Sequence, residues 1–129
     1  MSRILTGTNT YTGMTEVREG VLEIDTTGSI TSTLLTLHKD TSFRDSSSGS
    51  VPTLTQLNVR GTNATYDGEL SAQNATLNFY LPNGISAGST LLNVDDDADI
   101  SDSTVILFLD GGTSSALLIR PINMFKRHI

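Results

Sequence analysis

Two very short segments, Thr15–Val17 and Val21–Ile24, are predicted to be β-strands, and they place the strongest constraint on what this chain can fold into. Side chains alternate along a β-strand, so Leu22 and Ile24 share one face of the second segment. Strands of three or four residues do not form a stable hairpin on their own. Each must therefore pair above and below with equivalent strands, which is the architecture of a solenoid of stacked repeats. The residues expected to form turns around the two segments are Gly7, Asn9, Gly13, Gly20 and Gly28.

The composition agrees with an all-β fold. Thr, Ser, Asn and Gly are abundant and Trp is absent, and no window shows the 3.6-residue apolar spacing of a helix. With 129 residues the chain is at most one domain, or a piece of a larger one, and is long enough to bury a core. We therefore expect a β-solenoid over residues 1–119, followed by an irregular tail over residues 120–129.

Further strands are expected where apolar residues alternate between turn residues. They are Thr33–His38, Leu54–Val59, Leu77–Leu81, Thr90–Val94 and Thr104–Leu109. In Leu77–Leu81, we expect Phe79 to point inward and Asn78 and Tyr80 to point outward. Thr104–Leu109 is apolar on both faces, which predicts that both faces are covered, by a loop or by a second copy of the chain.

Polar residues indicate the corners. The segment Asp45–Pro52 is rich in serine and is expected to be a loop that leaves the stack. Asn63 and Asn74 each precede a strand, which predicts two strands on adjacent faces of one coil. Asparagine also recurs across the predicted strands, and stacked asparagines can bond to one another when equivalent positions repeat. The asparagines in question are Asn58, Asn63, Asn74, Asn78, Asn83 and Asn93.

Residues 5–30 resemble the passenger-associated repeat of bacterial autotransporters. The segment reads LTGTNTYTG, then a Thr-x-Val strand, then Gly20-Val21-Leu22, close to the family pattern L-T-G-x-N-T-Y-T-G-G-T-x-V-x-x-G-x-L. Met14 departs from it, since the family usually has a second glycine there. The resemblance implies a right-handed parallel β-helix that is exported to the bacterial cell surface.

Residues 75–112 also resemble autotransporter passengers, in the region near the C-terminal end of the passenger. The shared features are a LNFYLP-type strand, a G-x-T-x-L-x-V strand and an A-D-I-x-x-S-x-V strand in this order. The resemblance implies a structural stalk or adhesin segment of a surface protein, which helps the passenger to fold during secretion. A host surface or matrix ligand is then expected for the full-length protein. This chain shows neither an apolar signal sequence nor a membrane span, and is expected to lack its own barrel.

The charge distribution argues against several partners. The net charge is −6, and residues 61–119 contain eight acidic residues and neither Lys nor Arg. Nucleic acids and anionic membranes require clustered cations, so neither is expected as a partner. A homo-oligomer is expected instead, formed through the open solenoid ends or the strand around Phe108. Cysteine is absent, so the redox environment cannot be read from disulfides.

The acidic run Asp95–Asp102 is the candidate metal site. An EF-hand loop beginning at Asp95 would place Asp97 and Asp99 at its third and fifth positions, but it requires glycine and glutamate where this chain has Ile100 and Ile106. The remaining acidic residues of the run are Asp96 and Asp102. The pattern predicts a solvated turn that holds no functional metal, and weak calcium binding stays open as the alternative.

Catalytic residues are not indicated, and neither is a cofactor. The two histidines, His38 and His128, lie at a strand end and in the tail, and no serine sits in a nucleophile elbow. A carbohydrate-binding or carbohydrate-cleaving β-solenoid is the alternative function, since such proteins share the expected fold. Cleavage would require carboxylates that converge on one groove with a basic residue. We therefore expect a non-enzymatic protein.

Overall fold

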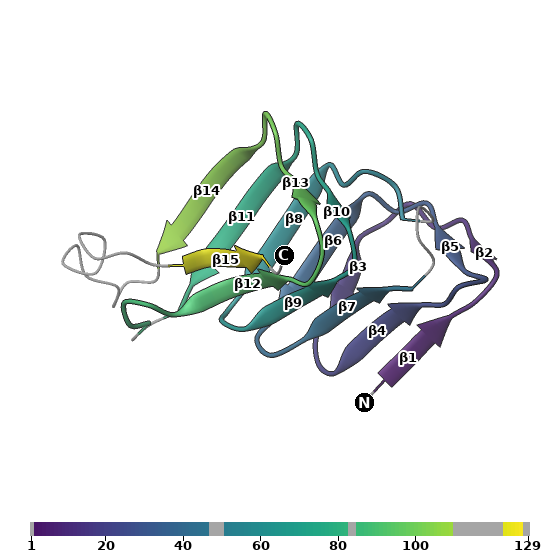
Figure 1. Ribbon diagram of the computed structural model, residues 1–129, viewed down its shortest axis with the longest axis horizontal. Coiled ribbons are helices and arrows are strands. Elements are labelled where there is room, and N and C mark those ends of the chain that lie inside the picture. The colour runs from purple at the N-terminus through teal and green to yellow at the C-terminus, as the bar shows by residue number, and fades with distance from the viewer. Residues whose placement is uncertain (1, 47–50, 83–84, 110–122, 128–129) are drawn as a thin grey trace.

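The computed structural model describes residues 2–46, 51–82, 85–109 and 123–127 and shows a parallel β-solenoid (Figure 1). The strand pairs in the described residues are all parallel, as expected for stacked coils, and the all-β prediction is confirmed. One sheet, here sheet A, contains β1 (Ser2–Leu5), β4 (Val21–Ile24), β7 (Ser42–Asp45), β9 (Ala64–Asp67), β12 (Thr90–Val94) and β15 (Asn123–Arg127), in this order. The other large sheet, here sheet C, contains β3 (Thr15–Val17), β6 (Leu34–His38), β8 (Gln56–Arg60), β11 (Thr76–Leu81) and β14 (Thr104–Leu109).

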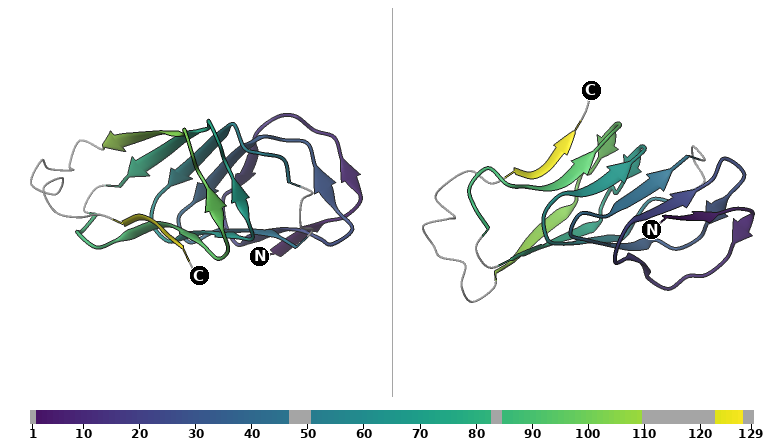
Figure 2. Two further views of the ribbon diagram at one scale, coloured as in Figure 1. Left: turned by 45° about the horizontal axis from the view of Figure 1, so that its top comes forward. Right: turned by 90° about the horizontal axis from the view of Figure 1, so that it is seen from below.

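A third side connects the two large sheets, as the views in Figure 2 show. It holds two small parallel sheets, β2 (Thr8–Asn9) with β5 (Ser29–Ile30) and β10 (Leu70–Ser71) with β13 (Ala98–Asp99). Between them, the backbone N–H of Leu54 donates to the carbonyl of Ser71 at 2.8 Å. Each coil thus runs from sheet A through the third side to sheet C, and then turns back to sheet A one strand further along.

Most of the predicted strands are confirmed, several of them to the residue. Two strands of sheet C begin later than predicted. β6 begins at Leu34 and not at Thr33, and β8 begins at Gln56 and not at Leu54. The shortest strands, β2, β5, β10 and β13, were not predicted, because two residues are too few to show alternation. Strands β1 and β7 were also missed, because charged residues interrupt the apolar pattern in SRIL and SFRD. The tail was predicted to be irregular, but it contains β15, which pairs with β12. The prediction was wrong there because parallel pairing in register can impose a strand on a segment that lacks alternation.

The core consists of columns of apolar side chains that repeat from coil to coil. Val17, Leu37, Val59 and Phe79 occupy aligned positions on neighbouring strands of sheet C. All four are buried, and the expected inward orientation of Phe79 is confirmed. Full burial of such side chains stabilises the fold by roughly 1.5–3 kcal/mol each. A parallel column in sheet A contains Leu22, Phe43, Tyr66 and Val94.

The corners use left-handed backbone conformations. Asn63 and Asn74 have positive φ angles of 61° and 60°, a conformation that asparagine tolerates better than most residues. They lead into β9 and β11, which lie in the two large sheets of one coil, with β10 between them. The prediction that Asn63 and Asn74 precede strands on different faces of the same coil is therefore confirmed.

A buried polar ladder lies on the outward side of sheet C. Asn58 Nδ2 donates to Thr36 Oγ1 at 3.0 Å, and Asn78 Nδ2 donates to Asn58 Oδ1 at 2.8 Å. All three side chains are buried. Stacking of asparagines is therefore confirmed for Asn58 and Asn78. Asn63 and Asn74 act at corners instead, and Asn83 lies outside the described residues.

Strand β14 lies at the edge of sheet C and has the longest run of exposed large apolar side chains in the described chain. Val105, Ile106, Leu107 and Phe108 are 39–43% exposed. Within the described part of the chain, neither face of β14 is covered at these residues, and cover by a second copy of the chain stays a prediction. The interior of the predicted loop, residues 47–50, lies outside the described residues. The part of the chain that the structure describes has no helix of membrane-spanning length and hydrophobicity.

Candidate functional site

A column of cationic and aromatic side chains crosses the outward side of sheet C. The parallel register aligns His38 with Arg60, Arg60 with Tyr80, and Tyr80 with Phe108. Leu37, Val59 and Phe79, the residues that precede the first three, belong to the apolar core, and Leu107 is aligned with Phe79. Alternation therefore directs the four side chains of the column to the outside. The column therefore follows from coil lengths that bring the same strand position back at each turn.

Three members of this column stack on one another. The Arg60 guanidinium carbon lies 4.2 Å from the centroid of the Tyr80 ring, which is a cation–π contact. The rings of Tyr80 and Phe108 are 4.5 Å apart and inclined by only 9°. Because one side of Tyr80 holds Arg60 and the other holds Phe108, the guanidinium keeps a defined orientation.

His38 is held by an acidic neighbour. Its Nε2 atom lies 2.6 Å from Glu16 Oε2, and Arg18 Nε lies 3.2 Å from Glu16 Oε1. The hydrogen bond from His38 is the main cause that holds the pKa of Glu16 below its ordinary value, and Arg18 adds to it. The prediction that His38 is a surface or partly packed residue is confirmed, since it is half-buried at the end of β6. His128 lies outside the described residues.

A hollow of about 400 Å³ opens at the corner where sheet C turns into sheet A. Lys39 follows β6 and Arg60 ends β8. Pro82, Ile85, Ser86 and Ser89, which lie between β11 and β12, line the hollow from the next coil. Side-chain hydroxyls also line the hollow. The lining residues are Lys39, Arg60, Gly61, Thr62, Pro82, Ile85, Ser86 and Ser89.

Two other described cations are held by carboxylates, in contrast to the two cations of the corner hollow. Arg18 pairs with Glu16, and Arg44 lies 2.9 Å from Asp67 and 3.8 Å from Glu23. Among the residues that the structure describes, Lys39 and Arg60 have no carboxylate within 4.0 Å. Both cations are exposed, and none of the described residues that line the hollow is acidic.

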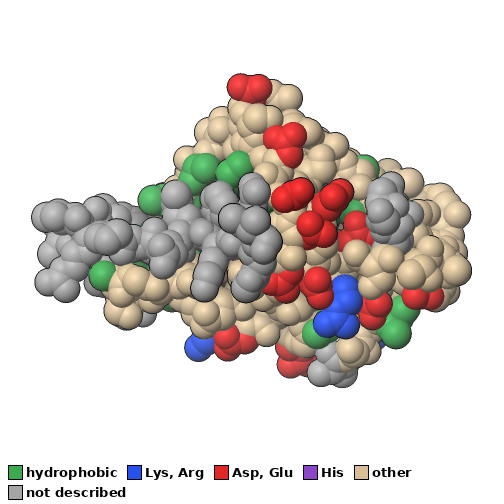
Figure 3. Space-filling model, in the orientation of Figure 1, with side chains coloured by type: hydrophobic (Ala, Val, Ile, Leu, Met, Phe, Trp, Pro, Cys, Tyr) green, Lys and Arg blue, Asp and Glu red, His purple; other side chains and the backbone are tan. Residues whose placement is uncertain are grey.

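Acidic side chains gather on the opposite side of the coil, over β10 and β13 (Figure 3). Glu69, Asp96 and Asp97 can bring one oxygen each to within 4.8 Å of one another. Among the described residues, Asp95, Asp97 and Asp99, the first three ligand positions of the EF-hand pattern, do not form a group of this kind. Glu69 was missed by the sequence analysis, since only the pairing of Leu70 with Ala98 brings it opposite Asp97.

Asp99 has a separate role in this acidic region. Its Oδ1 atom accepts hydrogen bonds from the Ser101 hydroxyl at 2.7 Å and the Ser101 backbone N–H at 3.1 Å. Gln73 Nε2 donates to its Oδ2 atom at 2.6 Å. These bonds, those from Ser101 first, hold the pKa of Asp99 below its ordinary value. The arrangement fixes the turn after β13. The prediction of one solvated turn over Asp95–Asp102 is wrong in part, because β13 lies within this run and pairs with β10.

A cleft of about 230 Å³ beside the acidic cluster bears on the carbohydrate-cleaving alternative. Asp45, Glu69 and Asp96 line it, together with Ser46, Val51, Gly68 and Ser71. No Lys or Arg belongs to this lining in the described chain. The cleft therefore offers carboxylates without the basic residue that the expected cleavage chemistry requires.

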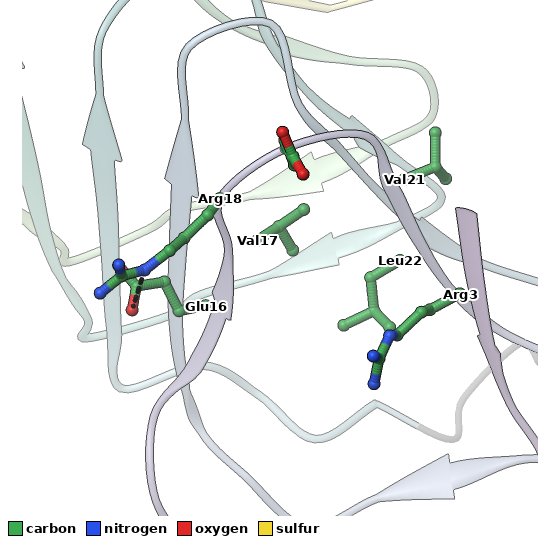
Figure 4. Close-up of a pocket in the computed structure, with 7 residues that line it drawn as sticks. Arg3, Glu16, Val17, Arg18, Val21 and Leu22 are labelled. Atoms are coloured by element: carbon green, nitrogen blue, oxygen red, sulfur yellow. Dashed lines mark ion pairs between the residues drawn. The ribbon is translucent and has the colours of Figure 1, made fainter. Parts of the chain in front are cut away.

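A third hollow, of about 250 Å³, lies at the N-terminal end of the solenoid (Figure 4). Val17 and Leu22 form its apolar floor, and Arg3 and Arg18 lie at its sides. Arg3 is aligned with Leu22, in a column that is apolar in the following coils. A charged side chain at such a position disfavours the addition of another strand at this end.

Comparison of the chain with protein-family models, with curated proteins and with solved structures gave no match.

Proposed function

We propose that this chain is a non-enzymatic stalk segment of a bacterial surface autotransporter passenger, which holds adhesive parts of the parent protein away from the cell. The observation that carries this proposal is the continuity of the columns. Val17, Leu37, Val59 and Phe79 stack without a break, and the ladder from Thr36 to Asn78 runs beside them. Each coil is bonded to the next along the solenoid axis, as a load-bearing element requires.

The autotransporter part of this proposal rests on the resemblance of residues 5–30 and 75–112. It assigns the parent protein to the bacterial cell surface or to secretion. It also gives the segment a second role, which is to help the passenger fold as it leaves the cell. A solenoid suits this role because each coil contacts mainly its neighbours, so folding propagates along the chain.

Force spectroscopy tests the stalk function. The chain is placed between two marker domains and pulled along its axis. Hydrogen-bonded partners in successive coils are 20–22 residues apart, so release of one coil should lengthen the chain by about 70 Å. Repeated steps of this size, at forces above those that extend an unfolded linker, are the expected result. Smooth extension at low force would contradict a stalk function.

A second candidate function, carbohydrate cleavage, is favoured by one observation, the cleft lined by Asp45, Glu69 and Asp96. The test is release of reducing sugar from a panel of polysaccharides by the purified chain. We expect no release above background. Release that is abolished by Glu69→Gln and Asp96→Asn would replace the stalk proposal with an enzymatic one.

A further inference from the structure

The corner hollow is a cationic site on a strongly acidic protein. Lys39 and Arg60 line it, none of the described lining residues carries a carboxylate, and the chain as a whole carries a net charge of −6. Asp40 follows Lys39 in sequence but does not belong to the lining. An anion at this place meets two cations whose charge no ion pair within the described residues neutralises.

The fold orients both cations. The guanidinium carbon of Arg60 lies 4.2 Å from the centroid of the Tyr80 ring. A guanidinium that stacks on an aromatic ring can still offer its N–H groups to an acceptor. Lys39 is fixed at its base by close packing of the next corner. A Cβ added to Gly61 would lie 2.9 Å from Lys39 Cβ, and Gly61 has a positive φ of 125°. The backbone of Gly61 thus passes directly beside Lys39 and sets its place relative to Arg60.

The rest of the lining suits a sugar better than a bare ion. Thr62, Ser86 and Ser89 contribute hydroxyl groups, which can donate to and accept from the hydroxyls of a sugar. The volume of about 400 Å³ falls within the range of small-molecule sites. Arg60 also joins the hollow to the stacked rings of Tyr80 and Phe108.

We propose that the corner hollow binds a saccharide that carries an oxyanion, either a sulfate or a carboxylate. Lys39 and Arg60 bind the oxyanion, with Arg60 able to offer two parallel N–H groups to two oxygens. The hydroxyls of Thr62, Ser86 and Ser89 bind the sugar ring. This site does not depend on the stalk function, because binding can be measured on the isolated chain.

Isothermal titration and NMR titration of the purified chain test the proposal with four probes. They are a sulfated chondroitin disaccharide, digalacturonate, the neutral disaccharide cellobiose and inorganic sulfate. We expect at least one acidic disaccharide to bind at least tenfold more tightly than cellobiose and than inorganic sulfate. The preference between the sulfated and the carboxylated disaccharide identifies which oxyanion the site takes.

Substitutions locate the site. Lys39→Gln with Arg60→Gln should weaken binding of the acidic disaccharide at least tenfold, while circular dichroism and melting temperature show that the fold is intact. Arg60→Lys keeps the charge but loses the planar fork and its stacking, and should weaken binding several-fold. Arg18→Gln is the matched control, since it removes one exposed cation of the same sheet that already pairs with Glu16.

Three results would overturn the proposal. Equal weakening by Arg18→Gln would show that net charge, and not the hollow, controls binding. Inorganic sulfate that binds as tightly as the disaccharides would mean a bare-anion site only. Binding of neither acidic disaccharide at millimolar concentration would mean that the hollow is not a saccharide site.

Discussion

Asn78 Nδ2 donates a hydrogen bond of 2.8 Å to Asn58 Oδ1, and the two residues lie 20 positions apart on neighbouring strands of sheet C. Asn58 also donates to Thr36 and accepts a bond of 3.1 Å from Gln56 Nε2. One amide therefore satisfies three polar neighbours at a place where water has little access. The ladder ties three successive coils together on the side of the sheet that faces away from the apolar core.

Replacement of Asn58 by alanine should destabilise the fold by about 1–3 kcal/mol. The substitution leaves the buried amide of Asn78 without its acceptor, and an unmet buried polar group costs roughly that much. Urea denaturation followed by circular dichroism measures the loss. The control is Asn93→Ala, since the Asn93 Oδ1 atom is buried without a hydrogen-bond partner in the described structure. That control should change the unfolding free energy by less than the Asn58 substitution, and an equal loss would contradict the importance of the ladder.

Replacement of Gly28 by alanine should destabilise the fold by roughly 1–3 kcal/mol, the usual cost of overpacking. A Cβ at Gly28 would lie 2.5 Å from the backbone carbonyl oxygen of Leu5, which cannot move without disturbing β1. The matched control is Gly13→Ala, because a Cβ there meets nothing within 4 Å. Thermal melting of both variants checks the prediction. If Gly28→Ala melts at the same temperature as Gly13→Ala, the close approach of the first two coils is not as described.

The hydrogen bond between His38 and Glu16 predicts a pH dependence of stability. The pKa of Glu16 is lowered in the folded state, mainly by its hydrogen bond to His38. The unfolded state therefore takes up a proton first as the pH falls. The stabilisation by Glu16 is complete above the ordinary glutamate pKa and is lost as the pH falls through the lowered value.

Melting temperatures of the unmodified chain and of Glu16→Gln, measured between pH 7 and pH 3, check this sign. The unmodified chain should melt higher at neutral pH, and the two curves should converge at the acidic end. A difference that grows toward low pH would mean that the pair does not stabilise the folded state. His38→Asn serves as the partner variant and should remove most of the same difference.

Calcium should not stabilise the chain. The carboxylates of Glu69, Asp96 and Asp97 are exposed, and the EF-hand pattern that begins at Asp95 lacks its glycine and its terminal glutamate. A tightly bound ion would stabilise the fold by about 2.7 kcal/mol at a hundredfold excess over its Kd. The melting temperature should be the same within about a degree in about 5 mM calcium and in excess chelator. A rise of several degrees with calcium, abolished by Glu69→Gln, would establish a metal site.

Strand β14 should drive self-association of the isolated chain. Ile106 and Phe108 are 39% and 42% exposed on the outward face of an edge strand. Burial of such side chains contributes roughly 1.5–3 kcal/mol each, enough to favour dimers at micromolar concentration if the surfaces fit. Sedimentation velocity should show association of the unmodified chain and a monomer for Phe108→Asp.

A second variant identifies the geometry of that contact. Ile4 in β1 is 59% exposed, at the other end of the solenoid. If Ile4→Asp also abolishes association, the copies join head to tail through both ends. If it has no effect, the contact is a symmetric one around β14. An unmodified chain that stays monomeric at high concentration would show that β14 is not an interaction surface.

Much of the fold could be read from local patterns in the sequence. Thr15–Val17, Val21–Ile24 and Thr90–Val94 show the alternation and the flanking turn residues that define short strands, and the structure has strands with the same limits. Asn63 and Asn74 were predicted to precede strands on adjacent faces of one coil, because each stands beside glycine or polar turn residues. These are properties of a few neighbouring residues, so the amino-acid sequence by itself determined them.

The surface features, in contrast, depend on contacts between residues in different coils. The stack of Arg60 on Tyr80 and the approach of Glu69 to Asp96 both depend on the register between strands. That register follows from the length of each coil, which varies with the corners and with the third side of the solenoid. Side chains alternate between the two faces of a strand whatever residue lies beside them in the next coil. The sequence therefore determined the strands and corners, and only the tertiary structure decided which side chains meet across them.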